Sequence, residues 1–327
     1  MRVLVAGAGA VGQWLGGRLL QDGHDTTLLC RAEQAAAING PGLFVRGHTT
    51  LHGHPKAVTE VPPATDPFEV ILLTCKAHQT APLAAAVAPH LKAGGVLASL
   101  QNGLGNGQKL LRSSPSMSQV ALALTSHGLT LEGPGRVHHA GLGPTLVGPL
   151  EAGSDQGARV LFGLLARVGL DPQWRDDMQG PVWRKALVNH AINPVAALHG
   201  VLNGDLVRRP ALHAQCLAVL AEGEEVARRA GIDLGGDSLA EAFGQTVART
   251  AANACSMLQD VRAKRPTEVE QITGRIVRLG EGLKVPVAQS ADLYRRLKDL
   301  EASYLGGQRA HHTTRDEAPF EAGPAHS

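Results

Sequence analysis

The sequence has few aromatic residues, few cysteines and no surplus of charge of either sign. Aromatic residues make up 3% of its 327 residues, there are four cysteines, and 31 Lys and Arg nearly balance 29 Asp and Glu. The balanced charge lacks the basic footprint of a nucleic-acid-binding protein, and no apolar run reaches the about 18 residues of a membrane-spanning helix. The cysteines are widely spaced and form no CxxC pair, which argues against a zinc ribbon or a disulfide scaffold and for a reducing compartment. We therefore expect a cytoplasmic protein that binds neither nucleic acid nor membrane.

The composition is that of a folded chain with a sizeable core. Hydrophobic residues make up 43% of it and charged residues only 18%, which excludes disorder as a description of the whole protein. Its length suggests two domains. The mostly apolar stretch Val3–Leu20 resembles a signal peptide, but its glycines, Gln13 and Arg18 interrupt any apolar core, so we interpret it as mature sequence.

The first half of the chain alternates short apolar runs with helical patterns. Continuous apolar runs suit strands that are buried on both faces of a parallel sheet, so the pattern predicts a doubly wound α/β domain over residues 1–178. The expected helices are Gly12–Gln21 and Pro82–Leu91. The expected strands are Arg2–Ala6, Thr26–Cys30, Val70–Thr74, Val96–Leu100, Val120–Thr125, Arg136–His138 and Thr145–Val147.

Beyond about residue 178 the strand patterns stop and helical patterns follow one another. The sequence therefore predicts an all-α second domain over residues 179–305, with the boundary near Asp176–Gly180. Residues 306–327 are rich in Gly, His, Thr and Pro and are expected to form a disordered tail. The expected helices are Trp183–Leu198, Pro210–Ala230, Leu239–Asp260, Thr267–Glu281 and Ala288–Tyr304.

The strongest local motif is a GxGxxG sequence that follows the first strand and opens the first helix. The first glycine permits a tight turn, the second lets the backbone approach a pyrophosphate, and the third allows close packing of helix on strand. The helix N-terminus also presents free N–H groups to the phosphates. The order strand, motif, helix, strand predicts a Rossmann-type dinucleotide-binding domain. The motif residues are Gly7, Ala8, Gly9, Ala10, Val11 and Gly12.

The end of the second strand indicates which dinucleotide is bound. A site for NAD usually carries Asp or Glu there, to bind the ribose 2′-hydroxyl. This chain has Cys30 followed by Arg31, so no carboxylate repels a 2′-phosphate and a guanidinium is available to bind it. The pattern favours NADP, although Arg31 could also be a surface arginine without a ligand.

Two further polar residues follow predicted strands of the parallel sheet. Lys76 and Asn102 come just after Val70–Thr74 and Val96–Leu100, and ligands collect beyond the carboxyl ends of such strands. We expect both residues to border the cofactor cleft, although each, taken alone, is equally compatible with an ordinary loop residue.

The helix Trp183–Leu198 carries a polar stripe of unusual composition. Lys185, Asn189 and Asn193 recur every four residues, so they lie on one face between apolar neighbours. A solvent-exposed face would be richer in Glu, Arg and Lys, so the stripe indicates the lining of a wet cleft. An ordinary solvated stripe is the alternative. Pro194 is expected to kink the helix just after the stripe.

A second polar cluster surrounds the predicted start of the helix Thr267–Glu281. Thr267 and Glu270 have the spacing of a capping box, which predicts Thr267 as the N-cap. Glu268 then takes the first helical position, where a carboxylate favours the helix dipole. Periodicity alone does not choose between that structural role and a catalytic one.

Three histidines, His48, His52 and His54, lie close together in a glycine-rich stretch. No Cys or acidic partner follows at a spacing typical of metal ligands. The stretch is expected to form a loop or an edge strand, and we interpret the histidines as solvated and predict no metal site.

These motifs, taken together and in order, resemble the ketopantoate reductase (2-dehydropantoate 2-reductase) family. The resemblance covers almost the whole chain to about Tyr304. It rests on Gly7–Gly12, Lys76-Ala77-His78-Gln79, Gln101-Asn102-Gly103, Lys185 with Asn189 and Asn193-Pro194, Asn203-Gly204, Ser256-Met257-Leu258-Gln259-Asp260 and Thr267-Glu268.

The resemblance implies an NADPH-dependent reductase that converts 2-dehydropantoate to pantoate, a step of pantothenate and coenzyme A biosynthesis. It implies that Lys185 is the general acid and that Glu268 is a catalytic carboxylate that also contacts the cofactor. Arg31, Lys76 and Asn102 would join the glycine motif in binding NADP. Substrate contacts would come from Asn102, Asn189, Asn193, Asn253 and Ser256.

Other functions stay open at this point. A related reductase could act on another 2-oxo acid or on an opine-type imine, and a catalytically silent NADP sensor is a third alternative. A silent protein would be expected to lose the lysine or the glutamate, yet Lys185 and Glu268 are both present. The expected partner is a small 2-oxo acid, and a homodimer is compatible with this interpretation.

Overall fold

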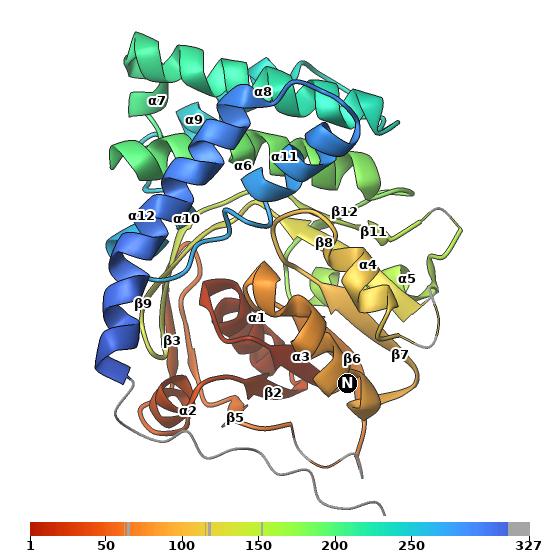
Figure 1. Ribbon diagram of the computed structural model, residues 1–327. Helices are drawn as coiled ribbons and strands as arrows, with labels where there is room; N and C mark the ends of the chain where they lie inside the picture. The colour runs from red at the N-terminus through yellow and green to blue at the C-terminus, as the bar shows by residue number, and fades with distance from the viewer. Residues whose placement is uncertain (62, 64–65, 115, 117–118, 152, 313–327) are drawn as a thin grey trace, which may run out of the picture.

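The first half of the protein is built on one eight-stranded, mostly parallel sheet (Figure 1). The computed structural model describes the chain except residues 62, 64–65, 115, 117–118, 152 and 313–327, and for residues 307–312 it describes the backbone alone. In the strand order β12-β11-β8-β7-β6-β1-β2-β5, only the β11–β8 pair is antiparallel. The strands are β1 (Arg2–Ala6), β2 (Asp25–Leu29), β5 (Lys56–Val58), β6 (Phe68–Leu73), β7 (Leu91–Ser99), β8 (Val120–Thr125), β11 (Thr145–Pro149) and β12 (Pro172–Trp174).

Helices cover both faces of this sheet, as the continuous apolar runs predict. Alternate residues of β1 serve the two faces: Val3 and Val5 join one hydrophobic cluster, and Leu4 and Ala6 join the other. One face packs against α1 (Ala10–Gln21), α2 (Ala32–Asn39) and α5 (Gln156–Arg167), and the opposite face packs against α3 (Thr80–Val87) and α4 (Asn106–Leu111). The doubly wound α/β class is thereby confirmed.

A second, four-stranded sheet lies against α1 and was not expected from the sequence. Its order is β4-β3-β10-β9, with β3 paired parallel to β10. Its strands are β3 (Leu43–Gly47), β4 (Leu51–Gly53), β9 (Gly128–Gly133) and β10 (Arg136–Gly141). Leu43, Val45 and Leu51 share the hydrophobic cluster of α1, and a Cβ atom at Gly17 would lie 2.6 Å from a Leu51 methyl group. The glycine in α1 therefore lets this sheet pack closely.

The second half is helical and lies over the carboxyl ends of the main sheet (Figure 1). Helix α6 is central, because it contacts α8, α9, α10 and α12, and it continues through Pro194. The helices are α6 (Gln179–His199), α7 (Asp205–Arg208), α8 (Pro210–Arg229), α9 (Leu239–Arg249), α10 (Ser256–Arg262), α11 (Thr273–Gly282) and α12 (Ala288–His312). Among the described residues, no helix is long and apolar enough to cross a membrane.

The expected helix Leu239–Asp260 is wrong, because the chain breaks between α9 and α10. Backbone carbonyls of this break accept hydrogen bonds from a distant loop: Ala251 from the N–H of Gly204 at 2.9 Å, and Asn253 from the N–H of Asn203 at 3.0 Å. These tertiary bonds satisfy backbone groups that a continuous helix would have bonded internally.

The predicted capping box is also wrong, because α11 begins at Thr273 and not after Thr267. The Thr267 hydroxyl accepts the N–H of Val269 at 3.1 Å, which makes a local turn. Glu270 binds Arg278 and the Tyr294 hydroxyl instead of reaching back along the chain. Glu268 therefore lies in an irregular segment, and the helix-dipole explanation for it is excluded.

The prediction of a disordered tail over residues 306–327 is wrong for its first residues, which are helical. Helix α12 continues through Gly306 to His312, and residues 313–327 lie outside the described part of the chain.

Candidate active site

The glycine motif forms an open cradle at the start of α1. Gly7 has a φ of 116°, in the left-handed region, and a Cβ atom at Gly12 would lie 1.9 Å from the carbonyl oxygen of Gly7. A Cβ atom at Gly9 would meet nothing within 4 Å, so the space in front of Gly9 is free. Gly9 caps α1 without a side-chain hydrogen bond, which leaves the first N–H groups of the helix available. Tight packing behind and open space in front fit a bound pyrophosphate.

Arg31 lies where the sequence predicts it, just beyond β2 at the N-terminus of α2. It is exposed, and it makes no ion pair or hydrogen bond through its side chain within the part of the chain that the structure describes. His78 lies near it: burial is the main cause that lowers the pKa of His78, and the charges of Lys76 and Arg31 lower it further. The Arg31 guanidinium is thus unpaired within the described chain, and its charge acts on the loop after β6.

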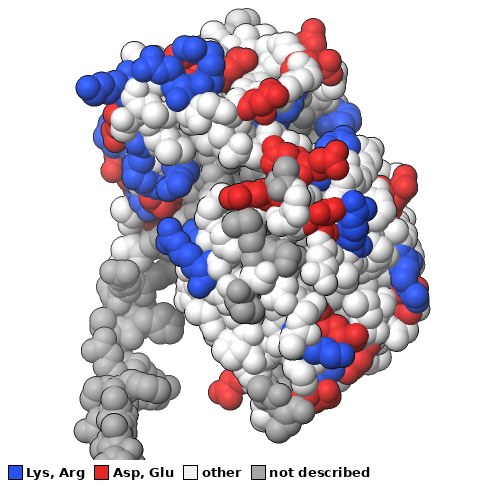
Figure 2. Space-filling model, turned by 90° about the vertical axis from the view of Figure 1, so that its right-hand side faces the viewer, with Lys and Arg blue, Asp and Glu red and all other residues white. Residues whose placement is uncertain are grey.

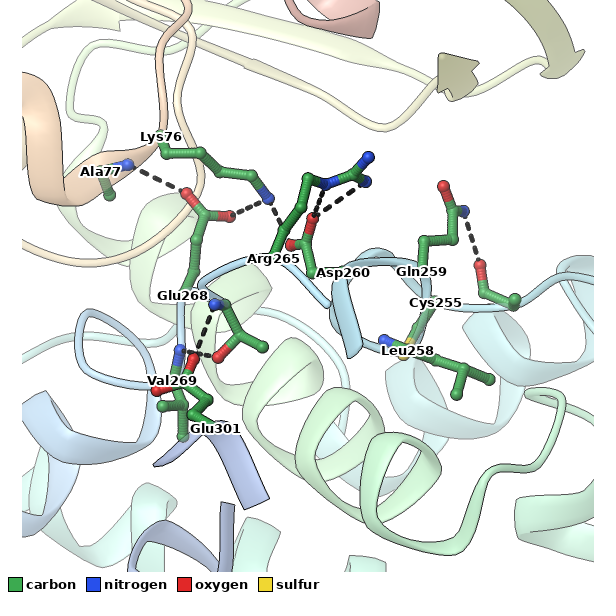
Figure 3. Close-up of polar contacts among 12 residues, drawn as sticks. Lys76, Ala77, Cys255, Leu258, Gln259, Asp260, Arg265, Glu268, Val269 and Glu301 are labelled. Carbon is green, nitrogen blue, oxygen red and sulfur yellow. Dashed lines mark hydrogen bonds and ion pairs between the residues drawn. The ribbon is translucent and has the colours of Figure 1, made fainter. Parts of the chain in front are cut away.

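Lys76 and Glu268 meet across the boundary between the two halves of the protein (Figure 3). Lys76 Nζ lies 2.6 Å from Asp260 Oδ2 and 3.8 Å from Glu268 Oε2. The other oxygen of Glu268 accepts the backbone N–H of Ala77 at 3.0 Å. The loop after β6, helix α10 and the segment that follows α10 therefore form one cluster of charges.

Charge balance within this cluster keeps Lys76 protonated. Burial opposes the charge of Lys76, but the carboxylates of Glu268 and Asp260 outweigh it and raise the pKa of the lysine. Arg265 adds a second cation, since its guanidinium donates to Asp260 Oδ1 at 3.2 Å. Both carboxylates are buried, with Asp260 3% and Glu268 7% exposed, so the pairing is made largely out of water.

Lys185 projects from α6 toward the end of β8. Its Nζ donates a hydrogen bond to the backbone carbonyl of Thr125, the last residue of that strand. The residue keeps a partly accessible surface, yet enough protein surrounds the ammonium group for burial to lower the pKa of Lys185 to about 8. The negative charge of Glu268 acts in the opposite direction. Lys185 and Glu268 are therefore electrostatic neighbours.

The asparagines of α6 continue the face that carries Lys185, because each lies one helical turn further on. Asn189 is half-buried and Asn193 is buried. The Asn193 carbonyl oxygen accepts the thiol of Cys255 at 3.7 Å, and Cys255 caps α10. This contact brings the start of α10 to the end of the stripe.

Asn253 and Ser256 flank Cys255, so the same contact places them near Asn193. Asn253 is half-buried, and Ser256 is exposed as the first residue of α10. Cys255 Sγ accepts the N–H of Leu258 as the N-cap of α10, and the Ser256 hydroxyl makes no hydrogen bond within the described residues. The structure thus gathers Asn189, Asn193, Asn253 and Ser256 on neighbouring elements.

Asn102 lies in the loop after β7, which also touches the second half of the chain. The N–H of Leu104 donates to the Gln271 carbonyl at 3.4 Å, three residues beyond Glu268. The Asn102 carbonyl is bonded to Asn106 at 2.8 Å. Asn102 therefore borders the boundary that Lys76 and Glu268 bridge.

Sequence reasoning gave no role to Asp260, to Gln101 or to the Thr125 carbonyl. Asp260 is the nearest partner of Lys76, and its signal in the sequence was its position in the motif Ser256–Asp260. Gln101 Nε2 donates to the Cys75 carbonyl at 2.9 Å and to the Thr80 hydroxyl at 2.8 Å, which ties the loops after β6 and β7 together. A backbone carbonyl such as that of Thr125 carries no signal in the sequence.

The overall charge of the protein is nearly balanced. In Figure 2, Lys and Arg side chains are interspersed with Asp and Glu over the face shown, in keeping with the net charge of +2. The local cluster of Figure 3, and not the overall charge, sets the electrostatics of the site.

Family models and curated relatives of this chain point to one and the same family. Residues 3–152 match the family model "Ketopantoate reductase PanE/ApbA", and residues 177–301 match its C-terminal counterpart. The chain is 32% identical to the 2-dehydropantoate 2-reductase of Pyrococcus horikoshii, over 94% of this chain and 99% of the relative. It is 33% identical to that of Vibrio cholerae, over 93% and 99%.

Solved structures agree with these sequence matches. A PanE/ApbA family ketopantoate reductase from Ralstonia eutropha superposes with a TM-score of 0.85 at 28% identity, covering 93% of this chain and all of that one. A D-mandelate dehydrogenase solved with NADH and anilino(oxo)acetate superposes with a TM-score of 0.86 at 25% identity, covering 93% and 99%. The fold, the two family models and the near-full-length relatives together show that this chain belongs to the ketopantoate reductase family of oxidoreductases.

Proposed function

We propose that the protein reduces 2-dehydropantoate to pantoate with NADPH, a step of pantothenate and coenzyme A biosynthesis. The observation that carries the proposal is the convergence of Lys185, Glu268 and Lys76 where the two halves of the chain meet. A ketone reduction needs a cation close to the oxygen that becomes an alkoxide, and such a cluster supplies one.

Residues 1–178 form the cofactor domain in this proposal. The N–H groups of Gly7–Gly12 bind the pyrophosphate, since the space in front of Gly9 is open. Arg31, exposed and unpaired within the described chain, binds the 2′-phosphate through charge-assisted hydrogen bonds. Lys76, Asn102 and Glu268 complete the contacts from the cleft. The bound nicotinamide supplies the hydride.

Lys185 acts as the general acid. With a pKa of about 8 it is mostly protonated near pH 7, yet it gives up its proton far more readily than an exposed lysine does. The ammonium group stabilises the developing alkoxide and then transfers a proton from Nζ to that oxygen. Glu268 favours the protonated lysine through its charge, and it holds the loop after β6 through its bond with Ala77.

Residues 179–305 form the substrate domain. Asn189, Asn193 and Asn253, together with Asn102 and the free hydroxyl of Ser256, offer the donors and acceptors that a 2-oxo acid with hydroxyl and carboxylate groups needs. These side chains lie on α6, near the start of α10 and after β7. They would therefore contact the substrate from both halves of the protein.

A second candidate function is the reduction of another 2-oxo acid or of an opine-type imine. The likeness to a D-mandelate dehydrogenase that was solved with anilino(oxo)acetate favours this alternative over a silent NADP sensor. The residues that neutralise an alkoxide would be the same, and only the asparagine lining would select the substrate.

The test is an NADPH oxidation assay over a panel of 2-oxo acids and imines, with ketopantoate included. We expect ketopantoate to give the highest kcat/KM. A higher kcat/KM for another 2-oxo acid would replace the substrate assignment, and no oxidation above background with any compound would refute the enzyme itself.

We also propose that the enzyme is cytoplasmic. This location is in keeping with its free thiols, those of Cys30, Cys75, Cys216 and Cys255. A homodimer is part of the same proposal, and sedimentation equilibrium of the full chain would test it.

A further inference from the structure

A chain of hydrogen-bonded polar side chains begins at His127, two residues after the Thr125 carbonyl that binds Lys185. The proposed reaction does not use these side chains. His127 Nδ1 lies 2.9 Å from His139 Nε2, and His139 Nδ1 lies 2.8 Å from the Thr49 hydroxyl. The Thr49 oxygen also receives Trp14 Nε1 at 3.3 Å and Arg18 Nη2 at 3.1 Å. The chain, which we call the His127–Thr49 network, runs from the end of β8 through the small sheet to α1.

The direction of every hydrogen bond in this network follows from donor chemistry. Trp and Arg nitrogens can only donate, so Thr49 Oγ1 accepts from both Trp14 and Arg18. Its own hydrogen therefore goes to His139 Nδ1, which must accept. A neutral His139 then carries its proton on Nε2 and donates it to His127 Nδ1. Each ring thus has one defined tautomer.

The surroundings favour these neutral rings. Burial is the main cause that lowers the pKa of His139 to about 4, and burial also lowers the pKa of His127. Charges on Arg18 from α1 and on His48 from the loop before β4 lower both further, whereas the Gly141 backbone opposes them. The network therefore keeps one pattern of hydrogen bonds through the neutral pH range.

His127 is joined to Thr125 by the turn that follows β8. The backbone N–H of His127 donates to the Thr125 hydroxyl at 3.3 Å, and the Thr145 hydroxyl donates to the same oxygen at 3.3 Å. Between them, the N–H of Ser126 donates to the Pro144 carbonyl at 2.9 Å. The ring of His127 fixes one end of this turn, and the carbonyl that accepts Lys185 Nζ lies at the other.

We propose that His127, held by the His127–Thr49 network, is a positioning residue for Lys185. The network fixes the turn, the turn fixes the Thr125 carbonyl, and the carbonyl fixes one position of a side chain that has four rotatable bonds. This inference rests on the proposed function, because it takes Lys185 as the acid. Loss of the network would let Nζ leave the position from which it reaches the substrate oxygen.

The experiment compares two pairs of variants in the full-length protein. His127→Leu removes the acceptor for His139, whereas His127→Asn keeps an amide oxygen that can take its place. Thr49→Val removes the hydroxyl, whereas Thr49→Ser keeps it. Thr49 lies at the far end of the network, so it tests transmission along the chain of bonds.

We expect His127→Leu and Thr49→Val to lower kcat by about 10- to 100-fold, as displacement of a catalytic group does, with little change in the KM for NADPH. The fall of kcat at alkaline pH should also move to lower pH, because a carbonyl acceptor favours the charged lysine. His127→Asn and Thr49→Ser should stay close to wild type in both measurements. A purely structural role would lower Tm but would not move the pH profile.

Two results would overturn the inference. One is an unchanged kcat and pH profile in His127→Leu and Thr49→Val below their melting temperatures. The other is a loss in His127→Asn equal to that in His127→Leu. Lys185→Ala, measured alongside, separates the two proposals: if it abolishes turnover while the network variants are normal, only the positioning role fails. If Lys185→Ala turns over normally, the assignment of the acid fails and the positioning role falls with it.

Discussion

Glu268 Oε1 accepts a 3.0 Å hydrogen bond from the backbone N–H of Ala77, which precedes it by 191 residues. The bond joins the loop after β6 to the irregular segment before α11, next to the ion pair of Lys76 and Asp260. One carboxylate therefore has a structural contact with the α/β half and an electrostatic contact with Lys185 of the helical half. Substitutions at this boundary should therefore show which residues contribute to cofactor binding and which contribute to the chemical step.

Lys185→Ala should lower kcat by at least about 100-fold, because the charge is most useful when the alkoxide forms. NADPH affinity should hardly change, since Lys185 projects from α6. Steady-state kinetics and a cofactor titration measure both. Arg184→Ala is the matched control, because Arg184 precedes it on α6 and donates to the carbonyls of Leu234 and Gly235. An equal loss of kcat in both variants would indicate damage to the helix instead.

Glu268→Gln should lower turnover by about 100-fold with little change in Tm, because it removes the charge and keeps an oxygen for the Ala77 N–H. Kinetics and thermal unfolding of the same preparation test this. Glu270→Gln is the control, since Glu270 binds Arg278 and Tyr294 outside the cluster. Normal turnover in Glu268→Gln would show that the catalytic carboxylate is another residue.

Arg31→Ala should weaken NADPH binding by about 1.5–3 kcal/mol, the range of a hydrogen bond to a charged group, and leave NADH binding unchanged. Calorimetric titration with each cofactor gives the two values. Arg295→Ala, an exposed arginine on α12, should change neither. Equal dissociation constants of NADPH and NADH for the wild type would contradict the choice of NADP.

Stability should fall as the pH drops below about 6.5, the ordinary pKa of histidine. Burial lowers the pKa of His190 to about 3 and that of His139 to about 4, so both stay neutral in the folded state while the unfolded chain takes up protons. Each histidine then costs about 1.4 kcal/mol per pH unit between pH 6.5 and its folded pKa. Urea unfolding at several pH values measures the slope.

His190→Gln tests the same account with one group removed. His190 lies between the Thr273 hydroxyl at 3.2 Å and the Ser290 hydroxyl at 3.0 Å, so the variant should be less stable at pH 7. Its stability should, however, depend less steeply on pH. An unchanged slope would mean that His190 does not titrate on unfolding.

The nucleotide-binding end of the fold could be predicted because its signals are local. The motif Gly7–Gly12 lies between a strand and a helix, and β1 is apolar on both faces, so sequence and structure agree there. The small sheet was missed because β3 and β10 pair across about 90 residues, and nothing in the short run Leu43–Gly47 indicates its partner.

In the helical half, features that depend on local spacing could be predicted from the sequence, whereas features that depend on tertiary contacts could not. The stripe of Lys185, Asn189 and Asn193 was correctly placed on one helix face, because spacing alone determines that. The capping box failed because Tyr294 and Arg278 compete for Glu270. The pairing of Lys76 with Asp260, 184 residues apart, depends on how the two halves meet and has no local signal.

The parallel pairing of β3 with β10 also bears on how the chain folds as it is synthesised. Until residues 128–141 leave the ribosome, β3 has an unpaired edge on the side where β10 will bind, and the sheet that covers α1 stays incomplete. An exposed strand edge invites association with other chains. Nascent chains that end before Gly128 should therefore need chaperone protection.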